Sequence, residues 1–335
     1  MTLSPPRHVP LVVATRGDLV ELVHVGSIAV VDAAGKLIAG IGDPAAFNFT
    51  RSALKPLQAL PFVADGGMSR FRYTSHELAL MCASHNGEAV HVAVVQGILD
   101  RIGLAEPDLQ CGCHPPNYFA HTGTQPPPGA RWNQLFHNCS GKHSGFLSWC
   151  RMHGAPTQRY LDPDSALQRR VRDVVRGYAA GSEPPMGIDG CSAPNFALPL
   201  TGLAQAFRDL ATGATPEHAA LAYAMTRHPD LVSGTARSDL ALMQTGNGDW
   251  VTKIGADGVQ AIGIRSRGIG IAIRIADGNA RALMAATVEA LQQLGVLGDA
   301  AGTPLAKYAR PQISNYRGTV VGRVEPLFTL PRVVS

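Results

Sequence analysis

Strand-like segments lie at both ends of this 335-residue chain, and helical patterns fill the middle. The terminal segments are short, rich in β-branched residues and bounded by turn residues, as strands are: Pro10–Ala14, Leu19–His24, Ser27–Val31, Lys36–Ala39, Val251–Ile254, Val259–Ile264 and Gly268–Ala276. The middle repeats apolar residues at helical spacing over 94–102, Ser165–Tyr178, Leu200–Leu210 and Pro216–Arg227. The sequence therefore predicts a mixed α/β (α+β) fold, in which both chain ends build an antiparallel sheet and a helical lobe is inserted between them.

Local patterns refine this prediction. Ala33-Ala34-Gly35 forms a tight reversal between two N-terminal strands, which indicates an antiparallel hairpin. Isoleucines alternate with other residues from 269 to 275, which predicts a strand with one fully buried face. We expect a single two-lobed body over 1–335, with a sheet lobe at 1–50 and 245–335 and a mainly helical lobe at 51–244. The active site is expected in the crevice between the lobes.

Composition argues against several classes of function. The net charge is only +4, and the Lys and Arg residues are scattered, so we expect no nucleic-acid partner. The apolar runs stop far short of the ~20 residues that span a bilayer, so we expect no membrane partner and a cytoplasmic protein. Several of the six cysteines lie beside His, Lys and Asp, which indicates reactive or metal-binding thiols rather than a disulfide framework.

A Ser-x-x-Lys motif is formed by Ser52 and Lys55, at the predicted start of a short helix, where both side chains share one face. A serine hydroxyl needs a base to become a nucleophile, and a desolvated lysine can take its proton. The motif is weak on its own. Ser84-His85-Asn86 and Lys253-Ile254-Gly255 follow it in the order of the S-x-x-K, S-D-N and K-T-G motifs of serine β-lactamases and penicillin-binding proteins.

A second cluster of reactive groups combines the loop at 137–145 with a later segment at 188–192. The loop contains Cys139, Lys142 and His143, and the later segment contains Asp189 and Cys191. Thiolate and imidazole are preferred zinc ligands, so the cluster can form a zinc site. The cations can equally activate a nucleophilic cysteine, or the thiols can be ordinary buried residues. The residue types alone leave these interpretations open.

The combined motifs resemble the class 3, rhizobial-type and thermolabile L-asparaginases of the asparaginase II family. The resemblance runs from Val20 to Gly278, and its motifs occur in the family's order: Phe49–Pro56, Cys82–Glu88, His137–His143, Ile188–Cys191 and Lys253–Gly258. It implies a fold similar to serine β-lactamases and glutaminases. It also implies an amidohydrolase that converts L-asparagine to L-aspartate and ammonia, and a homodimer.

The resemblance further implies roles for individual residues. Ser52 matches the acylated nucleophile and Lys55 its base, while a second Ser and Lys pair beside them matches Ser84 and Lys253. A zinc ion (Zn2+) is implied next to the nucleophile, with ligands that match Cys139, Lys142 and Cys191. The α-amino and α-carboxylate groups of the substrate need charged partners, and the candidates, which spacing does not assign, are Arg51, His143 and Asp189.

Two other functions fit part of the pattern. A serine acylase related to β-lactamases or penicillin-binding proteins would explain the Ser-x-x-Lys motif, although such enzymes do not require the cysteine loop. A zinc-binding protein without catalysis would explain the cysteine loop alone. Within the asparaginase interpretation, the acyl group is expected on Ser52 rather than on Cys139, because Lys55 lies on the same helical turn as Ser52.

Overall fold

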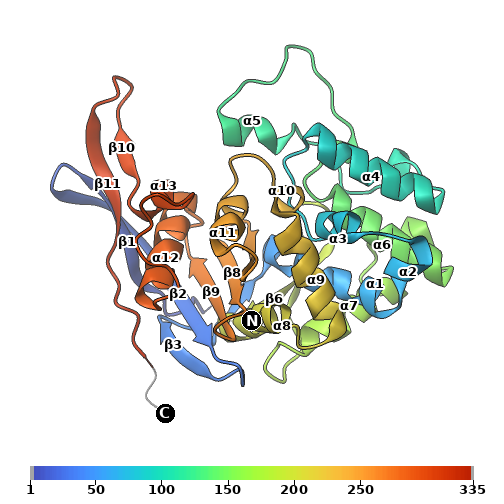
Figure 1. The fold of residues 1–335 in the computed structure, drawn as a ribbon, viewed down its shortest axis with the longest axis horizontal. Coiled ribbons are helices and arrows are strands. Elements are labelled where there is room, and N and C mark those ends of the chain that lie inside the picture. The colour runs from blue at the N-terminus through green and yellow to red at the C-terminus, as the bar shows by residue number, and fades with distance from the viewer. Residues whose placement is uncertain (1–3, 333–335) are drawn as a thin grey trace.

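An antiparallel sheet of eight strands forms one side of the molecule (Figure 1). The computed structural model describes residues 4–332, so 1–3 and 333–335 of the predicted sheet lobe lie outside the described residues. The strand order is β10-β11-β1-β2-β9-β8-β7, and β3 pairs with β2. These strands are β1 (Val9–Arg16), β2 (Leu19–Val31), β3 (Leu37–Ile41), β7 (Trp250–Gly255), β8 (Val259–Ile264), β9 (Ile269–Ile275), β10 (Gln312–Ser314) and β11 (Val320–Pro326). The predicted antiparallel sheet from both chain ends is confirmed.

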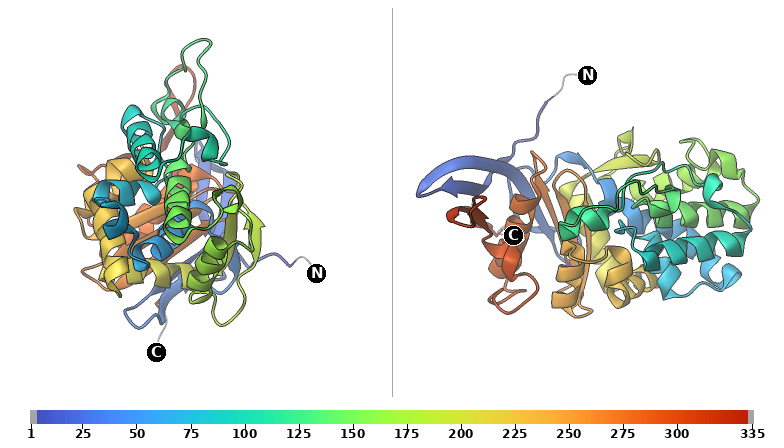
Figure 2. Two further views of the ribbon diagram at one scale, coloured as in Figure 1. Left: turned by 90° about the vertical axis from the view of Figure 1, so that its right-hand side faces the viewer. Right: turned by 90° about the horizontal axis from the view of Figure 1, so that it is seen from above.

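Most helices lie in the segment between the two groups of strands, on the other side of the molecule (Figure 2). They are α1 (Lys55–Ala64), α2 (Gly67–Phe71), α3 (Ser75–Met81), α4 (Ala89–Ile102), α5 (Asn117–Thr122), α6 (Ser140–His153), α7 (Ala166–Arg176), α8 (Leu200–Thr212), α9 (Pro216–Arg227), α10 (Pro229–Val232) and α11 (Ser238–Gly246). Two more helices, α12 (Ala280–Gln293) and α13 (Ala306–Ala309), follow the last long strand. A small sheet joins β4 (Phe47–Phe49), β6 (Pro194–Pro199) and β5 (Met186–Ile188).

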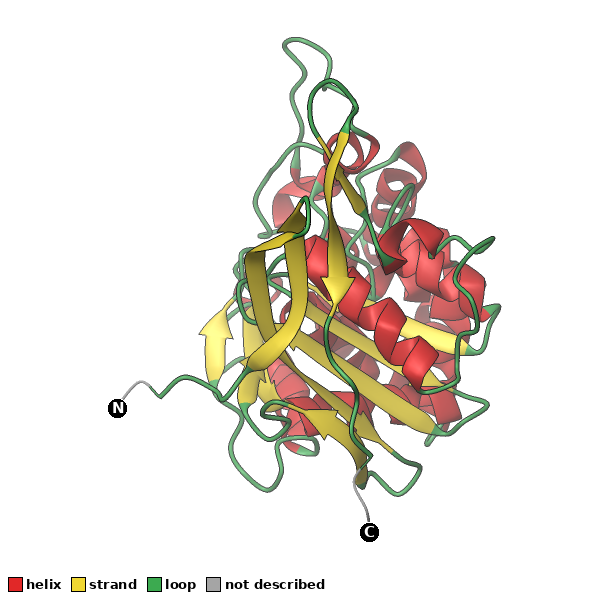
Figure 3. Cartoon of the chain, turned by 90° about the vertical axis from the view of Figure 1, so that its left-hand side faces the viewer, coloured by secondary structure: helices red, strands yellow, loops and turns green. Residues whose placement is uncertain are grey.

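Helices cover both faces of the large sheet (Figure 3). The isoleucines of β9 pack with leucines and alanines of α12 on one face. The predicted fully buried face is confirmed. The residues between the isoleucines face α8, and all of them except Arg274 are buried as well. The pattern has a structural reason: large residues fill the space below α12, and small residues let α8 lie close to the strands.

Two paired glycines define the contact with α8. Gly263 of β8 is opposite Gly270 of β9, and a Cβ on either would lie 1.9 Å and 1.8 Å from the carbonyl oxygens of Phe207 and Ala204, respectively. Since these contacts are with helix backbone, no side-chain rotation can relieve them. Only glycine at both positions allows α8 to lie at this distance from the sheet.

Gly270→Ala is therefore expected to lower the free energy of unfolding by about 3 kcal/mol, because α8 has to move away from the sheet. Denaturant unfolding of the purified protein measures this change. Gly97→Ala is the matched control, since Gly97 lies exposed in α4 and a Cβ there meets nothing within 4 Å. The control should be neutral or stabilising by up to about 1 kcal/mol. Equal stability of the two variants would contradict the close approach of α8.

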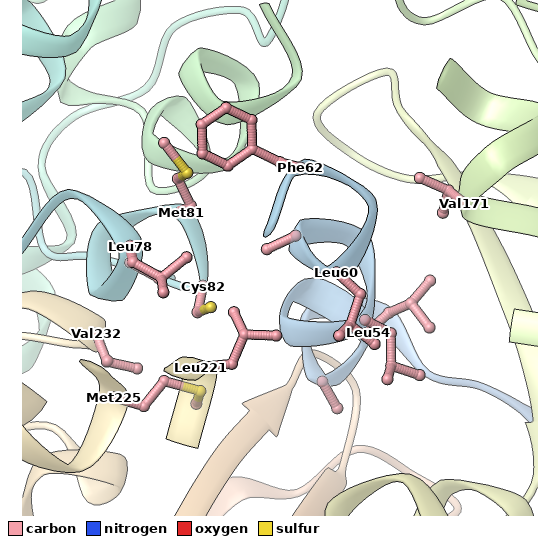
Figure 4. Packing of buried hydrophobic residues seen from close by; sticks show 14 of the residues in the cluster. Leu54, Leu60, Phe62, Leu78, Met81, Cys82, Val171, Leu221, Met225 and Val232 are labelled. Carbon is pink, nitrogen blue, oxygen red and sulfur yellow. The ribbon is translucent and has the colours of Figure 1, made fainter. Parts of the chain in front are cut away.

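The helical lobe has its own core around α1, which packs against α3, α6, α7 and α9 (Figure 4). Leu60 of α1 and Leu54 just before it lie near Leu221 and Cys82 in this core. The helix is buried over residues 55–62. Its first side chain, Lys55, is therefore carried into the protein interior.

The N-terminal strands differ from prediction at one point. The sequence predicts a break between His24 and Ser27, but β2 continues through it as one strand of 13 residues. Gly26 pairs with Val9 on one side and with Ile275 on the other, so the backbone is held in the sheet where a turn was expected.

The predicted lobe boundaries at residues 50/51 and 244/245 stay a prediction. Within the predicted helical lobe, α8 packs on the sheet, and β5 and β6 form strands. Among the described residues, no helix combines the length and the apolar character needed to cross a membrane.

Candidate active site

Ser52 lies in a single 3-10 turn, Arg51–Leu54, that leads directly into α1. Strand β7 lies against this turn. A Cβ on Gly255 would lie 2.6 Å from the carbonyl oxygen of Thr50, so the strand can approach only with glycine there. The last residue of the Lys253-Ile254-Gly255 motif thus has a packing reason, which is the position of the turn that carries Ser52.

The backbone next to Ser52 is strained and is held by a buried side chain. Arg51 has a φ of 49°, in the left-handed region that residues with a Cβ avoid. Asn195 of β6 accepts a hydrogen bond from the Arg51 N–H at 3.1 Å and donates one to the Arg51 carbonyl at 3.0 Å. Such conformations persist where the surroundings determine them. The two bonds fix the peptide groups around Arg51, and with them the backbone at Ser52.

Lys55 lies buried below the serines, and all its recorded partners are oxygen atoms. Its Nζ donates to the Ser84 hydroxyl at 2.9 Å, to the Ala83 carbonyl at 2.6 Å and to the Asn138 carbonyl at 3.4 Å. Among the described residues, its serine partner is thus Ser84 and not Ser52. Hydrogen bonds of a catalytic base are often longer in a free enzyme than in its substrate complex.

Lys253 is fully buried in β7 and forms an ion pair with Asp239, whose Oδ2 lies 3.3 Å from its Nζ. It also donates to the Ile254 carbonyl at 2.9 Å. Burial lowers the pKa of Lys253 to about 8 despite the opposing effect of Asp239. Burial also acts to raise the pKa of Asp239, but Lys253 and the hydrogen bonds to this carboxylate outweigh it and lower the pKa.

A cavity of about 200 Å³ is lined by hydrogen-bond partners of both lysines, Ser84 and Asn138 for Lys55 and Ile254 for Lys253. Ser52 and Ser84 both line it, together with Asn138, Arg237 and the segment 254–258. The structure thus brings Ser52 of the Ser-x-x-Lys motif and Ser84 of the Ser84-His85-Asn86 motif to one cavity. The Lys253-Ile254-Gly255 motif forms part of its wall.

Arg51 points to two carboxylates. Its Nε donates to Asp189 Oδ1 at 2.9 Å, and its Nη1 pairs with Asp257, which also lines the serine cavity. Two predicted substrate-binding residues, Arg51 and Asp189, therefore bind each other next to Ser52.

The cysteine cluster lies beside the same cavity. Cys139 precedes α6, Lys142 lies in its first turn, and Cys191 follows β5. The Lys142 Nζ donates to Cys191 Sγ at 3.0 Å, and the Cys139 thiol donates to Asn138 Oδ1 at 3.3 Å. Contact with Cys139 and the charge of Lys142 lower the pKa of the Cys191 thiol against the effect of burial. Asn138, which lines the serine cavity, connects the two regions.

His143 is fully buried in α6 and does not line the serine cavity. Its Nδ1 forms a 2.7 Å hydrogen bond with the Tyr160 hydroxyl. Its Nε2 has no hydrogen-bond partner among the described residues. Burial lowers the pKa of His143 to about 4. Lys142 adds to the effect of burial on this pKa and Cys191 opposes it, so the imidazole lies beside both of these residues.

The predicted ligand set contains thiols and an amine. Among residues 4–332, no group of three or more His, Cys, Asp or Glu side chains is placed to hold a metal ion. The cluster of Cys139, Lys142 and Cys191 contains two such side chains and a lysine. Two thiols and a neutral amine fit zinc, but Cys191 and Cys139 raise the pKa of Lys142 against the effect of burial, so this lysine would have to lose its proton to become a ligand.

The sequence did not identify several residues of this region. Asn195, Arg237 and Asp239 occur in no motif and reach the site only through the fold, and Asp257 lies within the motif Lys253–Gly258 but was given no role. Asn195 has one local signal: it is a polar residue in β6, a strand in which every residue is buried. Such a residue needs a hydrogen-bond partner.

Comparison with known proteins gives a family and two similar folds. A sequence model of the family described as L-asparaginase II matches residues 12–326. No curated protein matches the sequence. Among solved structures, the native form of Mglu is similar with a TM-score of 0.46 and 14% identity, over 83% of this chain and 66% of that chain. A β-lactamase from Mycobacterium bovis is similar with a TM-score of 0.38 and 14% identity, over 81% of this chain and 95% of that chain.

Proposed function

Because the chain belongs to the L-asparaginase II family, we propose that it hydrolyses L-asparagine to L-aspartate and ammonia through a Ser-Lys acyl-enzyme. Family membership makes it an amidohydrolase. One observation supports the serine route most directly: Ser52 and Ser84 line one cavity, and the buried Lys55 donates to Ser84. The proposal includes membership of the class 3 group, which the motifs named above resemble.

In the proposed reaction, the Ser52 Oγ attacks the carbon of the substrate's side-chain amide and gives up its proton to Lys55. For this step Lys55 has to be neutral and its hydrogen bond with Ser84 reversed, so that Ser84 passes its own proton to Lys55 as it takes the proton of Ser52. The C–N bond then breaks, and the nitrogen leaves as ammonia after it takes a proton. Water attacks the remaining ester, which releases L-aspartate and restores the Ser52 hydroxyl.

The position of Ser52 is expected to depend on Asn195. Asn195→Ala should lower kcat about tenfold or more, because the strained Arg51 backbone relaxes and Ser52 moves from its position. Ammonia release measures kcat and KM. Asn48→Ala is the matched control, since Asn48 lies on the adjacent β4 and its side chain bonds only to the local Ala46 carbonyl. A kcat equal to that of the control would contradict the positioning role.

The proposal includes zinc held by Cys139, Lys142 and Cys191. A zinc ion would supply positive charge near the substrate amide. The residues of this chain support the site in two ways: the three donors converge, and the unsatisfied His143 Nε2 lies in the same buried region. Asp189 lies beside this region and is held by Arg51.

Metal analysis tests the zinc site without reference to turnover. Wild-type protein purified with zinc should retain it after dialysis, and Cys191→Ser should lose it, because the thiolate is a principal ligand. Cys113→Ser is the matched control, since Cys113 is exposed and lies outside the cluster. Equal zinc in Cys191→Ser and the control would contradict the ligand assignment.

The homodimer and the cytoplasmic location remain predictions from the resemblance and the composition. Sedimentation of the purified protein over a range of concentrations tests the first. A mass equal to that of the 35.3 kDa chain at every concentration would contradict a dimer.

Ammonia release from L-asparagine by the purified protein tests the main proposal. We expect release from L-asparagine, and L-glutamine in a parallel assay shows the selectivity. A fluorescent penicillin forms the other arm of the test. Covalent labelling by penicillin without ammonia release would favour the β-lactamase-like serine acylase. Bound zinc without turnover of any amide would favour a zinc-binding protein without catalysis.

A further inference from the structure

Arg237 lies between two neighbouring cavities. It lines the cavity of about 200 Å³ that contains Ser52 and Ser84. It also lines an adjoining cavity of about 340 Å³ on its other side, with His121, Arg281 and Tyr308. Arg237 therefore forms part of the wall of the serine cavity, although it belongs to none of the predicted motifs.

The charge of Arg237 has no carboxylate partner among the described residues. Its Nη1 donates to His121 Nε2 at 2.9 Å and to Asn86 Oδ1 at 3.5 Å. The amide is neutral, and burial together with Arg237 itself lowers the pKa of His121 to about 4, so His121 is neutral at pH 7 as well. The nearby Asp239 forms its ion pair with Lys253 instead. A poorly hydrated guanidinium without a counter-charge is costly to a protein, which indicates a role in binding an anion.

The other cations near Ser52 are already engaged. Arg51 is paired with Asp189 and Asp257. Lys55 uses its ammonium group on Ser84 and two carbonyls, and Lys253 is paired with Asp239. The partners of Lys55 are uncharged too, but Lys55 does not line the cavity. Among the described residues that line the serine cavity, Arg237 is the one cation, and it has no ion-pair partner there.

We propose that Arg237 binds the α-carboxylate of the amino-acid substrate, an inference that rests on the proposed function. An arginine fork matches the two oxygens of a carboxylate and can form two parallel hydrogen bonds with it. Asp257 lines the same cavity with the opposite charge and provides a partner for the α-ammonium group. The cavity then matches an α-amino acid: a cation, a carboxylate and a serine nucleophile are arranged around one small volume.

This assignment gives Arg51 a different role from the one expected from the sequence. Arg51 was one candidate for the charged substrate groups, but its guanidinium already holds two carboxylates. Its contact with Asp257 gives it a positioning role, since it orients the carboxylate that faces the cavity.

Steady-state kinetics of Arg237→Gln on L-asparagine tests the proposal. The KM should rise by about 10- to 100-fold with a much smaller change in kcat, because a charge-assisted interaction with a non-reacting part of the substrate is lost. Arg281→Gln is the matched control: it removes the same charge from an exposed residue that lines only the adjoining cavity. An unchanged KM in Arg237→Gln, or a loss confined to kcat, would overturn the proposal.

A second substrate separates carboxylate binding from a general structural effect. β-Alaninamide is L-asparagine without its α-carboxylate. Wild type and Arg237→Gln should therefore release ammonia from it with the same kcat/KM, or both at a rate too low to detect. Wild type alone gives a further result that needs no folded variant: its kcat/KM should fall by at least about tenfold from L-asparagine to β-alaninamide. Equal rates on both amides would overturn the role of Arg237. No ammonia from L-asparagine by wild type would instead reject the proposed function itself, so the two failures are distinguishable.

Discussion

Ser52→Ala is expected to reduce the rate of ammonia release from L-asparagine by about 10⁴-fold or more. Without the Ser52 Oγ no ester can form, and removal of a nucleophile in a serine hydrolase has an effect of this size or larger. The structure gives the variant little reason to unfold. Ser52 is only partly buried, and the 3-10 turn that carries it is held by backbone bonds, by Asn195 and by the contact with Gly255.

The measurement is kcat/KM of the wild-type and variant proteins, with thermal unfolding to confirm that both are folded. Cys139→Ala provides the comparison, because Cys139 is the other candidate for the acyl group. It should keep the serine route, although loss of a zinc ligand is expected to lower its rate. Mass spectrometry of a quenched reaction adds a direct test, since the acyl group should be found on the peptide that contains Ser52. Full turnover by Ser52→Ala together with none by Cys139→Ala would reject the assignment.

The regular elements could be predicted because their patterns are local. The bounds of β8 and α9 agree with prediction to the residue. Turn residues bound the short, fully buried run of β8, and Thr215 caps the start of α9. The small sheet of β4, β6 and β5 was not predicted. Two of its strands have three residues each, too few to show a period, and they form only because β6 lies between them.

Contacts in the site could be predicted where two motifs were expected to meet. Ser84 and Lys55 belong to separate motifs that were expected to meet, and they are hydrogen-bonded in the structure. Arg237 and Asp239 could not be predicted in the same way. Each is an ordinary charged residue near a helix start, and its importance comes from burial and from neighbours that only the fold brings close.

Asp239 is the clearest example of such a residue, because its carboxylate binds several residues of β7 and one of β8. Its carboxylate is fully buried. Besides the ion pair with Lys253, it accepts hydrogen bonds from the Ile254 N–H at 2.8 Å, the Thr252 hydroxyl at 3.1 Å and the Gln260 amide at 3.2 Å. Ile254 lines the serine cavity, so the pair anchors a wall of the candidate active site.

Asp239→Asn is expected to lower the free energy of unfolding by about 3 kcal/mol near pH 6, because it leaves the Lys253 ammonium buried without a counter-charge. The loss should depend on pH with a defined sign. The pKa of Lys253 is about 8 in the folded protein against 10.5 for an unperturbed lysine. Between these values the unfolded chain binds the additional proton, so this lysine makes stability rise with pH.

Well above pH 8 the native Lys253 is neutral with or without Asp239, so the deficit of Asp239→Asn should be smaller at pH 10 than at pH 6. Urea unfolding of wild type and variant at both pH values measures it. Thr252→Val is the matched control: it removes one hydrogen bond to the same carboxylate without a change of charge, and its cost of about 1 kcal/mol should not depend on pH. The double variant Asp239→Asn with Lys253→Met should recover stability, since no buried charge remains. An Asp239→Asn deficit that is equal at both pH values would show that the lost hydrogen bonds, and not the charge of Lys253, are what Asp239 contributes to the fold.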